Sequence, residues 1–130
     1  MNSQQAVNSY KTIGTDSKFA IASSHRLVQL MFQGVKENIN LVKLSMKKQD
    51  YSEKGRYMGK ALGLIEYLKA CLEPGIDGDF SETLAALYGY MEVRLTEANL
   101  ENSEEKFDEV VGLVSQLEEG WNGIPEEYRA

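Results

Sequence analysis

Three segments of this chain carry the same helix start signal, and this repetition limits the possible folds more than any other feature. A capping residue is followed three positions later by a glutamate at Asp50 with Glu53, Asp79 with Glu82 and Asn102 with Glu105. The capping side chain accepts a backbone N–H of the first helical turn, and the glutamate can return a hydrogen bond. The sequence therefore predicts three helices that begin next to Asp50, Asp79 and Asn102.

Apolar residues at spacings of three and four define four amphipathic segments, one from about Ser24 to Lys48 and one after each start signal. The second segment ends at Glu73, Pro74 and Gly75, because proline lacks the amide donor and glycine permits a left-handed turn. The fourth segment ends near Trp121. Four such helices with short connections predict an all-α fold, an antiparallel four-helix bundle, without a strand.

The 130 residues favour one compact domain with flanking segments at both ends. Residues 1–22 are rich in polar residues without a sustained period, and we expect an N-terminal arm there. We expect the helical bundle over residues 23–121. Residues 122–130 then form a polar C-terminal tail.

Charge and hydropathy exclude several classes of partner. Twenty acidic and 14 basic residues give a net charge of −6, which argues against binding to nucleic acid. The polar N-terminus lacks the apolar core of a secretory signal, and no run of about 18 apolar residues predicts membrane insertion. Cys71 is the only cysteine, so no internal disulfide is possible. We therefore expect a cytoplasmic protein.

The residues that enzymes use are scarce in this chain. His25 is the only histidine, and helical bundles that bind two metals need inward-facing Glu-x-x-His pairs, which the sequence lacks. Gly55, Gly59 and Gly63 recur at every fourth position, a helical repeat that favours close helix packing over a phosphate loop. The sequence predicts no catalytic residue, no metal site and no cofactor.

Apolar residues exceed what a narrow bundle seam requires. Tyr51, Tyr90 and Val93 add to the inner stripes of their helices, as do Val28 and Phe32 in the first helix. A wide inner face with a few exposed apolar residues explains any one of them. Together they favour grooves that receive a helix or an extended segment of a partner.

Two longer segments carry a resemblance to a known family. Residues 22–34 (ASSHRLVQLMFQG) resemble the start of the first helix of the flagellin export chaperones, the FliS family, and residues 84–99 (LAALYGYMEVRLTEAN) resemble its Leu-Tyr-x-Tyr-Met, Arg-Leu and Ala-Asn pattern. Trp121 after the acidic fourth helix is a further shared feature. The resemblance extends from about Tyr10 to Trp121, although Ser24 stands where the family usually has proline.

The resemblance implies a chaperone that binds the disordered C-terminal region of flagellin in the cytoplasm, prevents premature polymerisation and assists type III export. The flagellar export apparatus is a further candidate partner, and we expect the free chain to be a monomer or a weak homodimer. Tyr10 in the arm would lie over a groove until flagellin binds. The groove candidates are Leu27, Leu30, Met31, Phe32, Leu64, Ile65, Leu87, Tyr88, Met91 and Leu95, with Arg94 and Asn99 as polar contacts.

Two other functions remain open from the sequence. A regulatory binding protein of the same fold could act on a transcriptional regulator or an export component, because fold alone does not define the partner. A metal-dependent bundle enzyme would carry stoichiometric bound metal. Co-purification distinguishes the first alternative, and elemental analysis distinguishes the second.

Overall fold

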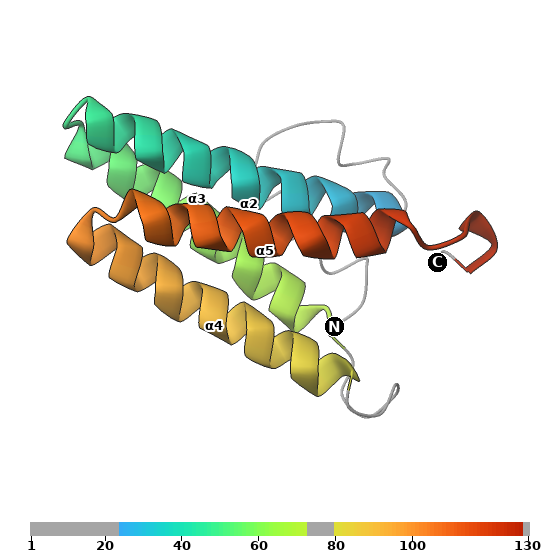
Figure 1. Ribbon diagram of the computed structural model, residues 1–130. Coiled ribbons are helices and arrows are strands. Elements are labelled where there is room, and N and C mark those ends of the chain that lie inside the picture. The colour runs from blue at the N-terminus through green and yellow to red at the C-terminus, as the bar shows by residue number, and fades with distance from the viewer. Residues whose placement is uncertain (1–23, 73–79, 129–130) are drawn as a thin grey trace.

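The computed structural model describes residues 24–72 and 80–128, which form four long α-helices and one short 3-10 helix (Figure 1). The predicted N-terminal arm, the break at Pro74 and Gly75 and the cap at Asp79 lie outside the described residues. No strand occurs in the part of the chain that the structure describes. The elements are α2 (Ser24–Lys47), α3 (Tyr51–Ala70), α4 (Phe80–Glu101), α5 (Glu104–Asn122) and η2 (Glu126–Tyr128).

The four helices form a closed ring in which each helix packs against its neighbours in the chain and α5 packs against α2. In Figure 1, α2 and α4 lie at opposite edges of the bundle. Lys36 of α2 pairs with Glu118 of α5, and Lys43, one heptad later, pairs with the earlier residue Asp108. The later residue of α2 thus pairs with the earlier residue of α5, so the two helices run antiparallel. The predicted all-α four-helix bundle is confirmed.

One apolar core runs through the bundle and receives side chains from all four helices. The stripe of α5, for example, buries Phe107, Val110 and Val114 at helical spacing, as its sequence pattern predicts. Removing such side chains from water supplies the main stabilising free energy of the fold. The helices therefore stand at fixed positions, and their outer faces form the surface of the bundle.

The cap of α3 follows the predicted pattern only in its first half. The Asp50 side chain accepts the backbone N–H of Glu53 at 3.1 Å, which confirms Asp50 as the N-cap. The backbone N–H of Asp50 donates to the Ser45 carbonyl at 2.9 Å, and the Glu53 carboxylate pairs with Arg56 at 2.6 Å. The turn from α2 thus takes over the bond that the glutamate was expected to make.

The predicted cap of α5 at Asn102 is wrong by one residue. Ser103 is the N-cap, because its hydroxyl accepts the backbone N–H of Lys106 at 3.2 Å. Asn102 instead has a left-handed backbone with φ of 51°, which lets the chain reverse between α4 and α5. Asparagine tolerates this conformation better than most residues, so the reversal uses Asn102 and the cap moves to Ser103.

The predicted close packing at the glycine repeat is also wrong. A Cβ atom built on Gly55, Gly59 or Gly63 would meet nothing within 4 Å. Met58 and Ala61 of the same helix face the core, so the glycines fall on the outer side of α3. The four-residue spacing marks one helix face, and spacing alone does not say which face is buried.

Candidate partner-binding site

Most residues predicted to contact a partner lie inside the bundle. Their side chains are at most 4% exposed, so they belong to the core of the described chain. Their burial stabilises the fold, and a contact between them and a partner stays a prediction. Tyr10 lies outside the described residues. The buried members of the predicted site are Leu27, Leu30, Met31, Phe32, Leu64, Ile65, Tyr88, Met91 and Leu95.

The other three predicted residues are half-buried on α4. Leu87 packs against the core. The Arg94 guanidinium Nε lies 2.7 Å from Glu109 Oε1, and another of its nitrogens lies 3.7 Å from Glu97. The backbone carbonyl of Asn99 accepts a hydrogen bond of 2.9 Å from the Lys54 ammonium. Arg94 and Asn99 thus hold helices together in the free protein.

Arg94 belongs to a polar network between α4 and α5. Glu109 accepts hydrogen bonds from the Tyr90 hydroxyl and from Arg94, and these two donors hold the pKa of Glu109 below its ordinary value of 4.5. The hydrogen bond to Glu109 likewise raises the pKa of Tyr90 and of Arg94. Lys106 of α5 adds a pair with Glu101 of α4 at 2.7 Å. This network fixes how α4 lies against α5.

The outer face of α4 carries exposed apolar residues in a helical row. We define the α4 row as the exposed Ala86, Tyr90, Val93 and Leu100 together with the half-buried, charged Glu97, which follow one another at spacings of four, three, four and three. Val93 is 59% exposed and Leu100 is 78% exposed. Apolar residues at this spacing form the seam through which one helix packs against another. The α4 row is therefore a surface suited to a partner's helix.

Sequence reasoning found part of the α4 row and missed its end. Tyr90 and Val93 stood out as surplus apolar residues, whereas Leu100 did not. Leu100 lies seven residues after Val93, so extending the same spacing by one heptad would have revealed it. What the sequence did not reveal is which of the apolar residues on this helix face outward.

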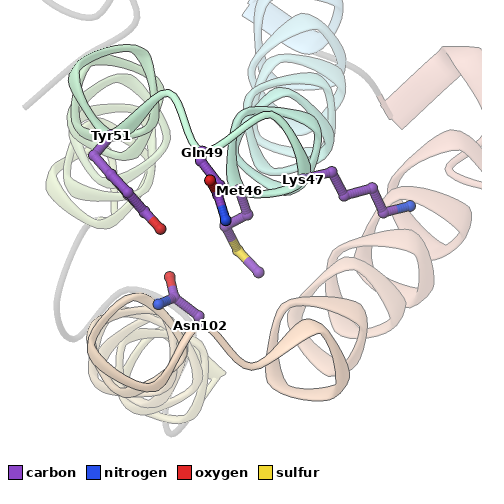
Figure 2. A pocket seen from close by; sticks show the side chains of 5 residues that line it. All are labelled: Met46, Lys47, Gln49, Tyr51 and Asn102. Atoms are coloured by element: carbon purple, nitrogen blue, oxygen red, sulfur yellow. The ribbon is translucent and has the colours of Figure 1, made fainter.

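A small cavity lies at the end of the bundle where the α2–α3 and α4–α5 turns meet (Figure 2). Its volume is about 210 Å³. Figure 2 shows the Tyr51 hydroxyl and the Asn102 amide directed toward one another across it. Leu100, the last member of the α4 row, lies two residues before Asn102. The cavity is lined by Met46, Lys47, Gln49, Tyr51 and Asn102.

Lys54 supports this end of the bundle from inside. Its side chain is buried, and its ammonium donates to the Asn99 carbonyl and, at 2.5 Å, to the Asn102 side-chain oxygen. These acceptors stand at the C-terminal end of α4, where a cation complements the helix dipole. The ammonium also lies 5.8 Å from the centre of the Tyr51 ring. Lys54 thus fixes Asn102 and the turn that it begins.

The described residues contain no group of three or more His, Cys, Asp or Glu side chains placed to hold a metal ion. None of the described helices has the length and hydropathy needed to cross a membrane. The fold and the exposed apolar residues of the α4 row are typical of one class of protein, the helical bundles that bind other proteins.

Comparison with known proteins identifies the family. The sequence model of the family described as flagellar protein FliS matches residues 6–128 of this chain. The chain is 35% identical to the flagellar secretion chaperone FliSB of Pseudomonas aeruginosa, over 95% of this chain and 98% of that protein. It is 32% identical to the flagellar secretion chaperone FliS of Vibrio cholerae, over 95% of this chain and 90% of that protein. The chain belongs to the FliS family of flagellar secretion chaperones, which are not enzymes.

The FliS protein of Salmonella typhimurium is also similar, at 32% identity over 95% of this chain and 93% of that protein. The family resemblance predicted from residues 22–34 and 84–99 is thereby confirmed. Membership of this family implies that the partner is a flagellar substrate.

Proposed function

We propose that this chain binds the disordered C-terminal region of flagellin in the cytoplasm. Binding keeps flagellin from polymerising prematurely and helps to deliver it to the type III export apparatus. The free chain is a monomer or a weak homodimer, which analytical ultracentrifugation measures directly. The observation that carries this proposal is the exposed α4 row in a flagellar secretion chaperone.

The α4 row suits a partner that is disordered before it binds. A flexible segment folds its short apolar stretches onto an exposed helix face, and Val93 and Leu100 offer apolar area for such contacts. The partner loses conformational entropy as it becomes ordered, which lowers the affinity for the area buried. Binding of this moderate affinity protects flagellin and still allows its release for export.

Isothermal titration with a synthetic peptide of roughly the last 40 residues of the cognate flagellin tests the proposal. We expect saturable one-to-one binding with a negative heat-capacity change, because apolar surface is buried. Val93→Asp and Leu100→Asp place a charge on the α4 row and should weaken binding about tenfold or more. Circular dichroism of each variant verifies that the bundle remains folded.

Leu44→Asp is the matched control. Leu44 is 46% exposed, but it lies on α2, at the opposite edge of the bundle from α4 (Figure 1). The control should retain wild-type affinity. If the folded wild-type protein does not bind the peptide at tens of micromolar, the flagellin proposal fails and a regulatory partner becomes the better candidate. If only Leu44→Asp weakens binding, flagellin binds elsewhere and the α4 row is not the site.

A further inference from the structure

The cavity at the turn end of the bundle brings together two residues with an unusual backbone. Gln49 has φ of 59° and Asn102 has φ of 51°, and they are the non-glycine residues with positive φ in the described part of the chain. Gln49 ends the turn after α2, and Asn102 begins the turn after α4. Both side chains line the same cavity (Figure 2).

The fold alone does not call for glutamine at position 49. A left-handed backbone is crowded for residues with a Cβ, and glycine adopts it without that cost. Asparagine tolerates the conformation because its short amide hydrogen-bonds locally, but glutamine has a longer side chain. Backbone strain of this kind persists only where the surrounding structure holds it, and such residues cluster at functional sites. The Gln49 side chain reaches the cavity.

The cavity combines apolar walls with amide groups. The Met46 thioether and the Tyr51 ring give it apolar surface, and Gln49 and Asn102 add side-chain amides. The Asn102 oxygen already accepts from Lys54 at 2.5 Å, so this amide offers chiefly its NH₂ donors to a ligand. Lys47 lies 3.9 Å from Glu104, so an anion that entered here would meet a carboxylate. The lining therefore favours a neutral ligand with an apolar part.

The size of the cavity narrows the choice of ligand. Its volume of about 210 Å³ is several times the roughly 30 Å³ share of one water molecule. It falls below the roughly 300–1,000 Å³ typical of cofactor and drug pockets. A single bulky side chain fits this range. Leu100 is only two residues from Asn102 in the chain, so the end of the α4 row is close enough to the cavity for one bound segment to contact both.

We infer that this cavity is the socket for one bulky apolar side chain of the bound flagellin segment. The amides of Gln49 and Asn102 hydrogen-bond to the peptide groups on either side of that side chain, because a peptide group offers a donor and an acceptor that match an amide. The inference rests on the proposed function. The socket fixes the register in which the segment lies along the α4 row.

Two substitutions separate this role from a structural one. Gln49→Gly removes the amide and relieves the left-handed backbone, so the thermal midpoint should rise while affinity for the flagellin peptide falls roughly three- to tenfold. Asn102→Asp keeps an acceptor for Lys54 and removes the NH₂ donors. Its thermal midpoint should stay equal or rise, with a similar loss of affinity. A purely structural role predicts that stability and affinity change together.

Lys48→Ala is the control, because Lys48 belongs to the same turn but does not line the cavity. Its affinity should equal that of the wild type. A second titration uses flagellin peptides with alanine at each bulky apolar position in turn. One of these peptides should bind the wild type more weakly than the parent peptide does, yet lose little further affinity with Gln49→Gly, because the amide contact depends on the side chain being docked in the cavity.

The outcomes distinguish the two proposals. Wild-type binding with unchanged affinity for both Gln49→Gly and Asn102→Asp overturns the socket and leaves the flagellin function standing. Absence of wild-type binding overturns both. Loss of affinity in the two variants, without a position in the peptide that couples to Gln49, assigns the amides a contact with the peptide but overturns the side-chain socket.

Discussion

The indole Nε1–H of Trp121 donates a hydrogen bond of 2.9 Å to the carbonyl oxygen of His25, a residue 96 positions earlier in the chain. The two rings are also stacked, with centroids 4.9 Å apart and planes within 12° of parallel. His25 lies in the first turn of α2 and Trp121 in the last turn of α5. One side chain thus joins the two ends of the helical ring.

Trp121→Phe tests the polar part of this contact. Phenylalanine retains an aromatic ring for the stack and removes the N–H donor, so we expect a loss of about 1 kcal/mol in the free energy of unfolding. Trp121→Ala also removes the ring and should cost more. Urea unfolding measures both. Equal stability of wild type and Trp121→Phe would show that the hydrogen bond does not contribute.

Lys54→Met tests the buried ammonium at the end of α4. Methionine preserves much of the apolar stem, while the Asn99 carbonyl and the Asn102 side chain lose their donor. We expect the free energy of unfolding to fall by about 1–3 kcal/mol. Lys60→Met is the matched control, because Lys60 is exposed on the same helix and should change stability by less than about 0.5 kcal/mol. Equal effects of the two substitutions would contradict the capping role.

Gly59→Ala should stabilise the free protein. The added Cβ meets nothing within 4 Å, and alanine favours a helix over glycine by roughly 1 kcal/mol. Thermal unfolding should therefore show a higher midpoint. Gly123→Ala serves as the comparison, since its Cβ would lie 3.4 Å from the Glu119 carbonyl oxygen and its gain should be smaller. A drop in stability for Gly59→Ala would mean that α3 is not open at this position.

The network around Glu109 predicts a loss of stability in acid. Hydrogen bonds from Tyr90 and Arg94 lower the pKa of Glu109 in the folded protein, so its contribution is fully present above the ordinary value of 4.5 and is lost as pH falls through the lowered pKa. Urea unfolding from neutral pH down to about pH 3 measures this change. Glu109→Gln lacks the ionising group and should show a smaller loss over the same range. An identical pH dependence in both proteins would exclude Glu109 as a source.

The sequence predicted the four long helices of the described residues and their order, because burial requires an apolar stripe on each one. It did not predict the short 3-10 helix Glu126–Tyr128. It placed one cap well, since Asp50 is the N-cap of α3 and its side chain accepts the backbone N–H of Glu53. It misplaced the cap of α5 by one residue, because asparagine and serine, the residues at 102 and 103, both cap helices well. The choice between them depends on which residue adopts the left-handed backbone of the turn, a property of the packed bundle.

The candidate site was harder to predict for a related reason. Periodicity identifies apolar residues that share a helix face, but it does not say whether that face points to the core or to solvent. Met91 and Val93 are both apolar residues of α4, yet Met91 is buried and Val93 is 59% exposed. The same ambiguity affected Gly55 and Gly59, whose regular spacing fits a packed face or an open one. The cavity needed both turns in place, because its lining residues come from segments about 50 positions apart in the chain, as Tyr51 and Asn102 illustrate.

The ring places the helices in space in the same order as in the chain, and this order has a kinetic consequence. Three of its four seams join helices that are consecutive in the chain, so most of the bundle can form through short loops of low entropic cost. During synthesis, α2 and α3 can pair before α5 has left the ribosome. The seam between α2 and α5, with the Trp121 contact, is then the last to form, so the bundle closes only after α5 has been made.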